Sequence, residues 1–211
     1  MPAPPRRPAA ILIAGPTASG KSAAALELAK RRGGTVINAD SMQVYRELSV
    51  LTARPASAEM VAIPHRLYGT VPAAEAYSVG HWLADAAAAM EEAKRQGRLP
   101  ILVGGTGLYF KALLEGLSPV PDIPSETRAF WREKSESLGP KELYRALRSR
   151  DPVMAARLRP TDPQRVVRAL EVIDATGVSL AEWQGTAGTP TLDSVAALKL
   201  VVAPEREPLY A

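Results

Sequence analysis

Eight consecutive residues near the N-terminus combine the residue types and the spacing that phosphate binding requires. The stretch GPTASGKS fits the pattern G-x-x-x-x-G-K-[ST]. Its glycines let backbone N–H groups converge on an anion, Lys21 supplies a point charge, and Ser22 offers a hydroxyl to Mg²⁺. The sequence therefore predicts a phosphate-binding loop, with Ser22 as a metal ligand, made of Gly15, Pro16, Thr17, Ala18, Ser19, Gly20, Lys21 and Ser22.

The loop alone leaves the phosphate compound open. A nucleotide kinase that binds ATP, a GTPase or a transferase that uses a diphosphate can each carry such a loop. The sequence has no N-K-x-D guanine-binding motif, and no apolar run has the form of a Walker B strand. The apolar run Leu99–Val103 continues instead into Gly104, Gly105 and Thr106. A hydrolysing motor or a switch GTPase is therefore disfavoured.

Asp40 is the second candidate for chemistry. It ends the run TVINAD, Thr35–Asp40, which predicts a buried strand. Ligands bind at the carboxyl ends of the strands in doubly wound sheets, so a carboxylate at this position could hold a metal or take a proton. Aspartate is also a good N-cap, so a capping role remains the competing interpretation.

The segments around these residues alternate between strand and helix patterns. Short apolar runs predict strands at Ala10–Ala14, Thr35–Asp40 and Leu99–Gly105. Helix patterns, with Ser78 as an N-cap and glycines as stops, cover Ser22–Arg32, Ser78–Gly97 and Leu108–Glu115. Strands that alternate with helices predict a parallel sheet with helices on both faces, which is an α/β fold of the P-loop NTPase type.

The pattern changes after the Pro-rich stretch SPVPDIPSE, which begins at Ser118. Residues Pro121–Gly185 lack strand patterns, and helices are predicted there at Glu126–Ser137, Pro140–Ser149, Pro152–Arg157 and Asp162–Ala175. The run ALKLVVAP, Ala197–Pro204, returns to a strand pattern. We therefore expect a flexible tail at 1–9, a core at 10–121, an all-helical insertion at 122–190, and a return to the core at 191–211 that lacks a helix to cover its strand.

Composition narrows the class of protein. The chain has 211 residues, of which 46% are hydrophobic, and its 26 basic and 22 acidic residues give a net charge of +4 that permits a polyanionic partner. The absence of cysteine excludes disulfides and cysteine-based zinc sites. The apolar run Ala9–Ala14 is too short for a signal sequence or a membrane span, so a cytoplasmic protein without membrane contact is expected. Apart from the last strand no long unpaired apolar face stands out, and a monomer is expected.

Six motifs occur in an order that points to one family. They are GPTASGKS, DSMQVY, TARP, PHRLYG, LVGGTGLYFKALLEGL and DPQRVVRALEV. In this order and at these distances the motifs resemble the tRNA dimethylallyltransferases, also called IPP transferases, over most of the chain. Members of that family normally continue for another third of a chain. The resemblance implies an enzyme that transfers a dimethylallyl group to the N6 amine of the adenosine next to the anticodon (position 37) in tRNAs that read codons beginning with U.

The resemblance also implies roles for individual residues. The phosphate loop would bind dimethylallyl diphosphate rather than ATP, Asp40 would act as the general base on the target amine, and Thr106 would be a catalytic residue that contacts tRNA near the reaction channel. The path of the flipped-out base would be lined by Asp40, Ser41, Met42 and Gln43. Further tRNA contacts are implied at Arg128, Gln164, Arg165, Val166, Val167 and Arg168.

The implied chemistry agrees with the residue types. An adenine amine is a poor nucleophile, so the reaction needs a strong allylic electrophile and a base such as Asp40 for the proton. Mg²⁺, Lys21 and loop N–H groups would meet the charge that develops on the departing diphosphate. The segment Lys141–Arg168 contains eight basic and three acidic residues, which suits an RNA backbone, although a solvated charged face has the same composition.

Other functions remain open from the sequence. An adenylate isopentenyltransferase that prenylates free AMP, ADP or ATP would share the loop and Asp40, but it would not need the basic insertion. An ATP-dependent small-molecule kinase is compatible with the loop alone, and a non-catalytic RNA- or diphosphate-binding protein is compatible with the short chain. The tryptophans are interpreted as packing residues rather than stacking platforms: Trp82, Trp131 and Trp183.

Overall fold

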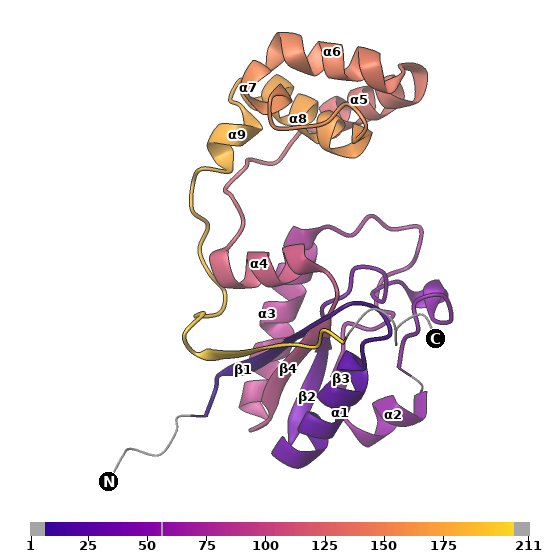
Figure 1. Ribbon diagram of the computed structural model, residues 1–211, viewed down its shortest axis with the longest axis vertical. Coiled ribbons are helices and arrows are strands. Elements are labelled where there is room, and N and C mark those ends of the chain that lie inside the picture. The colour runs from indigo at the N-terminus through magenta and orange to yellow at the C-terminus, as the bar shows by residue number, and fades with distance from the viewer. Residues whose placement is uncertain (1–6, 56, 205–211) are drawn as a thin grey trace. The chain divides into compact units, whose positions relative to one another are not determined.

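The computed structural model describes residues 7–55 and 57–204 (Figure 1). The chain divides into two compact units. The first, called here the sheet unit, comprises Met1–Gly116 and Thr189–Ala211. The second, called here the helical unit, comprises Leu117–Gly188, where the sequence places an insertion at 122–190.

The sheet unit is built on five parallel strands in the order β3-β2-β4-β1-β5. The strands are β1 (Ala10–Ala14), β2 (Gly34–Asn38), β3 (His65–Arg66), β4 (Leu99–Gly104) and β5 (Ala197–Val201). Every predicted strand is present, and the predicted α/β class is confirmed. The sequence does not predict β3, because two residues carry no alternation of apolar and polar side chains. Since β2, β4 and β1 are neighbours and parallel, the loops that follow them meet at one edge of the sheet (Figure 1).

The helices of the sheet unit are α1 (Lys21–Arg32), the 3-10 helix η1 (Arg46–Leu48), α2 (Ser57–Ala62), α3 (Val79–Arg95) and α4 (Gly107–Glu115). The predicted start of α3 is confirmed, because Ser78 Oγ accepts a hydrogen bond from the His81 N–H at 3.2 Å. The predicted end of α1 is also confirmed, since Gly33 caps it in the left-handed conformation that favours glycine. The sequence does not predict η1 or α2, which are both short.

Each face of the sheet packs against helices, because successive strand residues point to opposite faces. On one face Ile11 and Ile101 lie in the same buried cluster as Ala25 of α1. On the other face Leu102 lies in a second buried cluster with Trp82 of α3. Strands that are covered on both faces need apolar side chains on both, which is why the central strands are almost fully apolar. The packing also holds their carboxyl ends in fixed positions.

β5 is an edge strand of the sheet and pairs with β1, which Ala9 directly precedes. The side chains of Leu198 and Val201 on β5 are exposed. The Ala9 N–H donates a hydrogen bond to the Ala196 carbonyl oxygen at 2.8 Å, and Ala9 packs against the core. The flexible tail expected at 1–9 therefore does not extend to Ala9. Residues 1–6 of that tail, and residues 205–211 of the expected return to the core, lie outside the described residues.

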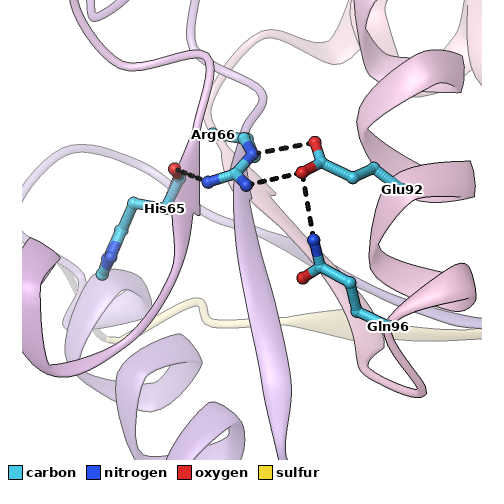
Figure 2. Close-up of polar contacts among 4 residues, drawn as sticks. All are labelled: His65, Arg66, Glu92 and Gln96. Atoms are coloured by element: carbon cyan, nitrogen blue, oxygen red, sulfur yellow. Dashed lines mark hydrogen bonds and ion pairs between the residues drawn. The ribbon is translucent and has the colours of Figure 1, made fainter.

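A two-residue strand has few ladder hydrogen bonds, and β3 is fastened to α3 by an ion pair (Figure 2). The Arg66 guanidinium donates to both carboxylate oxygens of Glu92, from Nε at 3.2 Å and from Nη2 at 2.9 Å. Gln96 Nε2 donates to the same carboxylate at 3.1 Å, and Arg66 Nη1 donates to the His65 carbonyl oxygen. The hydrogen bonds from Arg66 lower the pKa of Glu92 below its ordinary value.

The helical unit contains α5 (Ser125–Ser137), α6 (Pro140–Arg150), α7 (Pro152–Ala155), α8 (Pro163–Thr176) and α9 (Leu180–Trp183). All four helices that the sequence predicts in this segment are present, whereas α9, a single turn, is not predicted. Trp131, Leu147 and Leu170 lie in the buried core of this unit, and the packing interpretation of Trp82 and Trp131 is confirmed. In the part of the chain that the structure describes, no helix is long and apolar enough to cross a membrane.

Candidate active site

The loop between β1 and α1 has an unusual backbone. Gly20 and Ala18 have positive φ angles of 81° and 63°. Such an angle is easy for glycine but uncommon for alanine, and backbone strain of this kind concentrates at ligand-binding loops. Gly20 is the N-cap of α1 and offers no side-chain cap to the first helical N–H groups. These N–H groups and the positive end of the helix dipole are therefore suited to bind an anion.

The first glycine of the loop is required by a neighbouring strand. A Cβ atom at Gly15 would lie 2.5 Å from the carbonyl oxygen of Val202, the residue that follows β5. The Val202 N–H in turn donates to the Ala14 carbonyl oxygen at 2.8 Å. The sequence suggests that Gly15 serves loop flexibility, but its φ is not positive, and the structure attributes its small size to this close approach.

Lys21 lies against the loop that precedes it. Its side chain is buried, and its Nζ donates a hydrogen bond to the carbonyl oxygen of Pro16 at 2.9 Å. Burial lowers the pKa of Lys21 from its ordinary value, and the negative charge of Asp40 acts in the opposite direction. The ammonium and the carboxylate therefore interact electrostatically across the loop.

Asp40 begins a tight turn beyond the end of β2. Its Oδ1 accepts a hydrogen bond from the Met42 N–H at 2.9 Å, so the carboxylate caps a turn rather than the start of a helix. Within the described residues, Oδ2 accepts no hydrogen bond. A Cβ atom at Gly105 would lie 3.6 Å from this oxygen, so the glycine leaves the space beside it open. Asp40 can thus keep its position through one oxygen and use the other for proton transfer.

The turn after Asp40 is tied to the start of α4. The Ser41 N–H donates to Thr106 Oγ1 at 2.9 Å, and Thr106 Oγ1 lies 3.3 Å from Ser41 Oγ. The Thr106 N–H donates to the Ala39 carbonyl oxygen at 3.2 Å. Gly104 allows this approach, since a Cβ atom there would lie 2.0 Å from the same carbonyl oxygen. Thr106 therefore lies beside Asp40, although the two are far apart in the sequence.

One hollow of about 260 Å³ brings the phosphate loop and Asp40 together. It is lined by Thr17, Ala18, Ser19, Gly20, Lys21, Ser22, Asp40, Gln43, Thr52 and Ala53. Thr52 and Ala53 are not predicted as site residues from the sequence, although both belong to the motif TARP. Gln43 Nε2 donates to the Thr52 carbonyl oxygen at 2.7 Å, and Ala53 has a positive φ of 49°. Gln43 thereby joins the part of the lining at Thr52 to the turn that follows Asp40.

The remaining predicted tRNA contacts belong to the helical unit. A second hollow, of about 740 Å³, is lined by Arg157, Leu158, Arg159, Thr161, Asp162, Pro163, Gln164 and Arg165. Gln164 and Arg165 are exposed, and Arg168 forms an ion pair with the buried Glu171 at 3.2 Å. Arg128 is half-buried on α5. The side chains of Gln164, Arg165, Arg168 and Arg128 are polar and at least partly exposed, as a contact with RNA requires.

Two of the predicted contacts require a correction. Val166 and Val167 are 0% and 9% exposed and lie in the core of the helical unit. They occupy the inner face of α8, because an amphipathic helix that begins at Pro163 must bury part of its first turns. Their side chains therefore act through packing and cannot contact a ligand at the surface.

The structure also bears on where a metal ion could be held. Among the described residues there is no group of three or more His, Cys, Asp or Glu side chains that could bind a metal by itself. Ser22 is exposed and lines the same hollow as Asp40. This arrangement fits an ion such as Mg²⁺, which commonly takes few protein ligands and completes its coordination with phosphate oxygens and water.

Comparison with known proteins identifies the family. The IPP transferase family model matches residues 43–211, and the isopentenyl transferase model matches residues 8–75. A tRNA dimethylallyltransferase of Methylocella silvestris is 56% identical over 95% of this chain and 66% of its own length. Those of Azorhizobium caulinodans and Rhizobium leguminosarum are 55% and 57% identical over 96% of this chain, and 65% and 68% of their own lengths. The chain thus spans about two thirds of the curated relatives it matches.

Solved structures agree with this assignment. A eukaryotic dimethylallyltransferase acting on tRNA is 32% identical with a TM-score of 0.78, and the match covers 95% of this chain and 50% of that one. A tRNA isopentenylpyrophosphate transferase from Bacillus halodurans is 40% identical with a TM-score of 0.51, over 81% of this chain and 56% of that one. The family match covers most of the chain, and the loop, Asp40 and Thr106 meet at one edge of the same sheet. We conclude that this chain belongs to the IPP transferase family.

Proposed function

We propose that this chain transfers the dimethylallyl group of dimethylallyl diphosphate to the N6 amine of the adenosine next to the anticodon of tRNA, at position 37 in tRNAs that read codons beginning with U. The observation that carries the proposal is the hollow lined by both the phosphate loop and Asp40. The names of the similar proteins, tRNA dimethylallyltransferases from several bacteria, support the choice of substrates.

The donor's diphosphate would lie at the loop. The uncapped N–H groups at the start of α1 and the Lys21 ammonium supply positive charge where negative charge develops on the leaving oxygens. Ser22 would hold Mg²⁺, which supplies further neutralisation of that charge when bound. The loop would thus bind a leaving group with the same backbone N–H groups and lysine that other proteins use to bind a nucleoside triphosphate.

The acceptor amine would lie on the Asp40 side of the hollow. The N6 lone pair forms the new C–N bond to the allylic carbon. At the same time the bond between that carbon and the diphosphate oxygen breaks, and the diphosphate leaves with the electron pair of the broken bond. The amine proton passes to Asp40, whose Oδ2 is available while Oδ1 stays on the Met42 N–H. Thr106 supports this geometry by holding the turn through Ser41.

The acceptor would be a tRNA adenosine, and this base must be extruded from its structured loop to reach such a hollow. The exposed arginines around the second hollow provide a basic surface for an RNA backbone. Neither a free nucleotide acceptor nor a kinase activity is favoured, since each would leave this basic surface without use. A cytoplasmic location and a monomeric state stay predictions.

The test is incubation of the 211-residue chain with labelled dimethylallyl diphosphate, Mg²⁺ and unmodified tRNA. We expect label in tRNA that has adenosine next to the anticodon, and none when guanosine replaces that adenosine. We expect Asp40→Asn to lower turnover about 10²- to 10⁴-fold while leaving pyrophosphate binding within about twofold. Label in free AMP but not in tRNA, or ATP consumption without a prenyl donor, would contradict the proposal.

A further inference from the structure

A buried amide stands directly before the proposed catalytic turn. Asn38, the last residue of β2, is 0% exposed, and every residue of this strand is buried. Its Oδ1 accepts a hydrogen bond from the Asp40 N–H at 2.9 Å, and its Nδ2 donates to the Asp40 carbonyl oxygen at 2.9 Å. One side chain therefore bonds to the main chain on both sides of the Asp40 Cα atom.

The same amide joins this turn to a second segment. Asn38 Nδ2 also donates to the carbonyl oxygen of Leu67 at 3.1 Å. Leu67 follows β3 and has a positive φ of 64°, which is unfavourable for leucine and must be stabilised by its surroundings. Both the amide nitrogen and the amide oxygen are thus engaged, as a buried polar side chain requires.

Asn38 is itself held from the face of the sheet that α3 covers. The indole Nε1–H of Trp82 donates to the Asn38 carbonyl oxygen at 2.8 Å, and Trp82 is fully buried. Its ring stacks on Tyr109 of α4, with ring centres 4.2 Å apart and planes inclined by 9°. The main chain and the side chain of Asn38 are therefore both immobilised, so the amide is a rigid support for the groups that it bonds.

We propose that Asn38 is a positioning residue for Asp40: by bonding both peptide groups of Asp40 it keeps Oδ1 on the Met42 N–H and leaves Oδ2 available to the acceptor amine. This inference rests on the proposed function for its consequence in catalysis, but the placement of Asp40 itself is measurable without any reaction. An apolar residue of similar size would fill the same space and would be the ordinary choice for a buried strand, so packing alone does not require an amide.

The test compares Asn38→Leu, Asn38→Ser and the control Thr35→Val in the 211-residue chain. Thr35 is buried on the same strand, and its hydroxyl has no hydrogen-bond partner among the described residues, so Thr35→Val removes a buried oxygen without removing a bond. We expect Asn38→Leu to lower kcat at least tenfold and to leave the Kd for magnesium pyrophosphate within twofold. Asn38→Ser, which retains an acceptor oxygen, should lose less, and Thr35→Val should match the unmodified chain.

Amide hydrogen exchange of the folded variants, followed by NMR, supplies a readout that is independent of activity. We expect exchange at the Asp40 and Met42 N–H groups to be at least tenfold faster in Asn38→Leu, with exchange in β4 unchanged. If Asn38→Leu does not fold, Asn38→Ser carries the same comparison with a smaller expected change. Unchanged Met42 protection, unchanged kcat, or a loss of pyrophosphate affinity in parallel with kcat would each overturn the proposal. If the unmodified chain makes no product, the proposed function fails for this chain, and hydrogen exchange alone decides the role of Asn38.

Discussion

Thr106 Oγ1 accepts a hydrogen bond from the Ser41 N–H at 2.9 Å, which joins the turn after β2 to the start of α4. The two residues are 65 positions apart in the chain, yet they lie side by side because β2 and β4 are neighbours in the sheet. Because Ser41 directly follows Asp40, this bond also restrains the main chain that carries the Asp40 carboxylate. The β2 turn and the β4 loop therefore form one structural unit at the edge where the phosphate loop also lies.

Replacing Thr106 by valine should slow prenyl transfer. Valine keeps the shape but leaves the half-buried Ser41 N–H without its acceptor, which costs about 1–3 kcal/mol, so we expect kcat to fall about tenfold or more. Thr106→Ser keeps the hydroxyl and is the matched control. Steady-state assays with tRNA measure both, and equal rates for the valine and serine variants would contradict the role assigned to the hydroxyl.

Lys21 should lose its function at a lower pH than an ordinary lysine. Burial lowers its pKa, so the cation that meets the diphosphate is lost as pH rises through a value below 10.5. We expect pyrophosphate affinity, measured by calorimetry, to decline on the alkaline side for the unmodified chain. Lys21→Arg should remove that decline because arginine stays charged, and Lys21→Met should bind weakly at every pH. An identical alkaline decline in Lys21→Arg would assign the titration to another group.

Gly15→Ala should destabilise the sheet unit. The added Cβ atom would meet the Val202 carbonyl oxygen at 2.5 Å, and overpacking of this kind costs about 1–3 kcal/mol. Gly107→Ala is the control, because nothing lies within 4 Å of the Cβ position there. Thermal unfolding compares the two variants. Equal unfolding midpoints for the two variants would contradict this prediction, because β5 would then move away from the added Cβ atom without loss of stability.

The arginines of the second hollow should contribute to RNA affinity through charge. We expect the double variant Arg157→Gln/Arg159→Gln to bind tRNA more weakly, and the slope of its salt dependence should fall by about one for each phosphate that no longer pairs with an arginine. Lys30→Gln/Arg32→Gln at the end of α1 removes the same net charge in the sheet unit. Filter binding over a range of salt concentrations measures both. Equal decreases in the two double variants would indicate a general charge effect rather than a surface on the helical unit.

The Arg66–Glu92 pair should make stability depend on pH in the acid range. The pKa of Glu92 is lowered in the folded state, so the stabilisation is present above the pKa of the unfolded chain, near 4.5, and is lost as pH falls through the lower folded value. We expect Glu92→Gln to lower the unfolding midpoint at neutral pH, with a difference that shrinks below pH 4.5. Glu27→Gln, in a more exposed pair with Arg31, is the control and should change the midpoint less.

Much of the site can be predicted from sequence because its residues are close in the chain or belong to ordered motifs. The loop from Gly15 to Ser22 and the position of Asp40 after a strand follow from local patterns of glycine and apolar residues. Motif matching does not separate the outward face of α8 from its buried face, so it includes Val166 and Val167 among the tRNA contacts although both side chains pack in the core. The role of Asn38 is not predictable from sequence for a related reason. The sequence shows an amide in a mostly apolar strand but does not show which backbone groups its side chain will bond.

The strand–helix alternation, the phosphate loop and the family resemblance are all encoded locally, because each depends on residues within one segment or on the order of segments. Three relationships emerge only when the chain is folded: Asp40 Oδ2 accepts no hydrogen bond from the described residues, Thr106 lies against Ser41, and Gln43 bonds to Thr52 in the lining of the hollow. The second of these depends directly on the order of the strands in the sheet. That order is set by packing between residues that are distant in the chain, which no local pattern encodes.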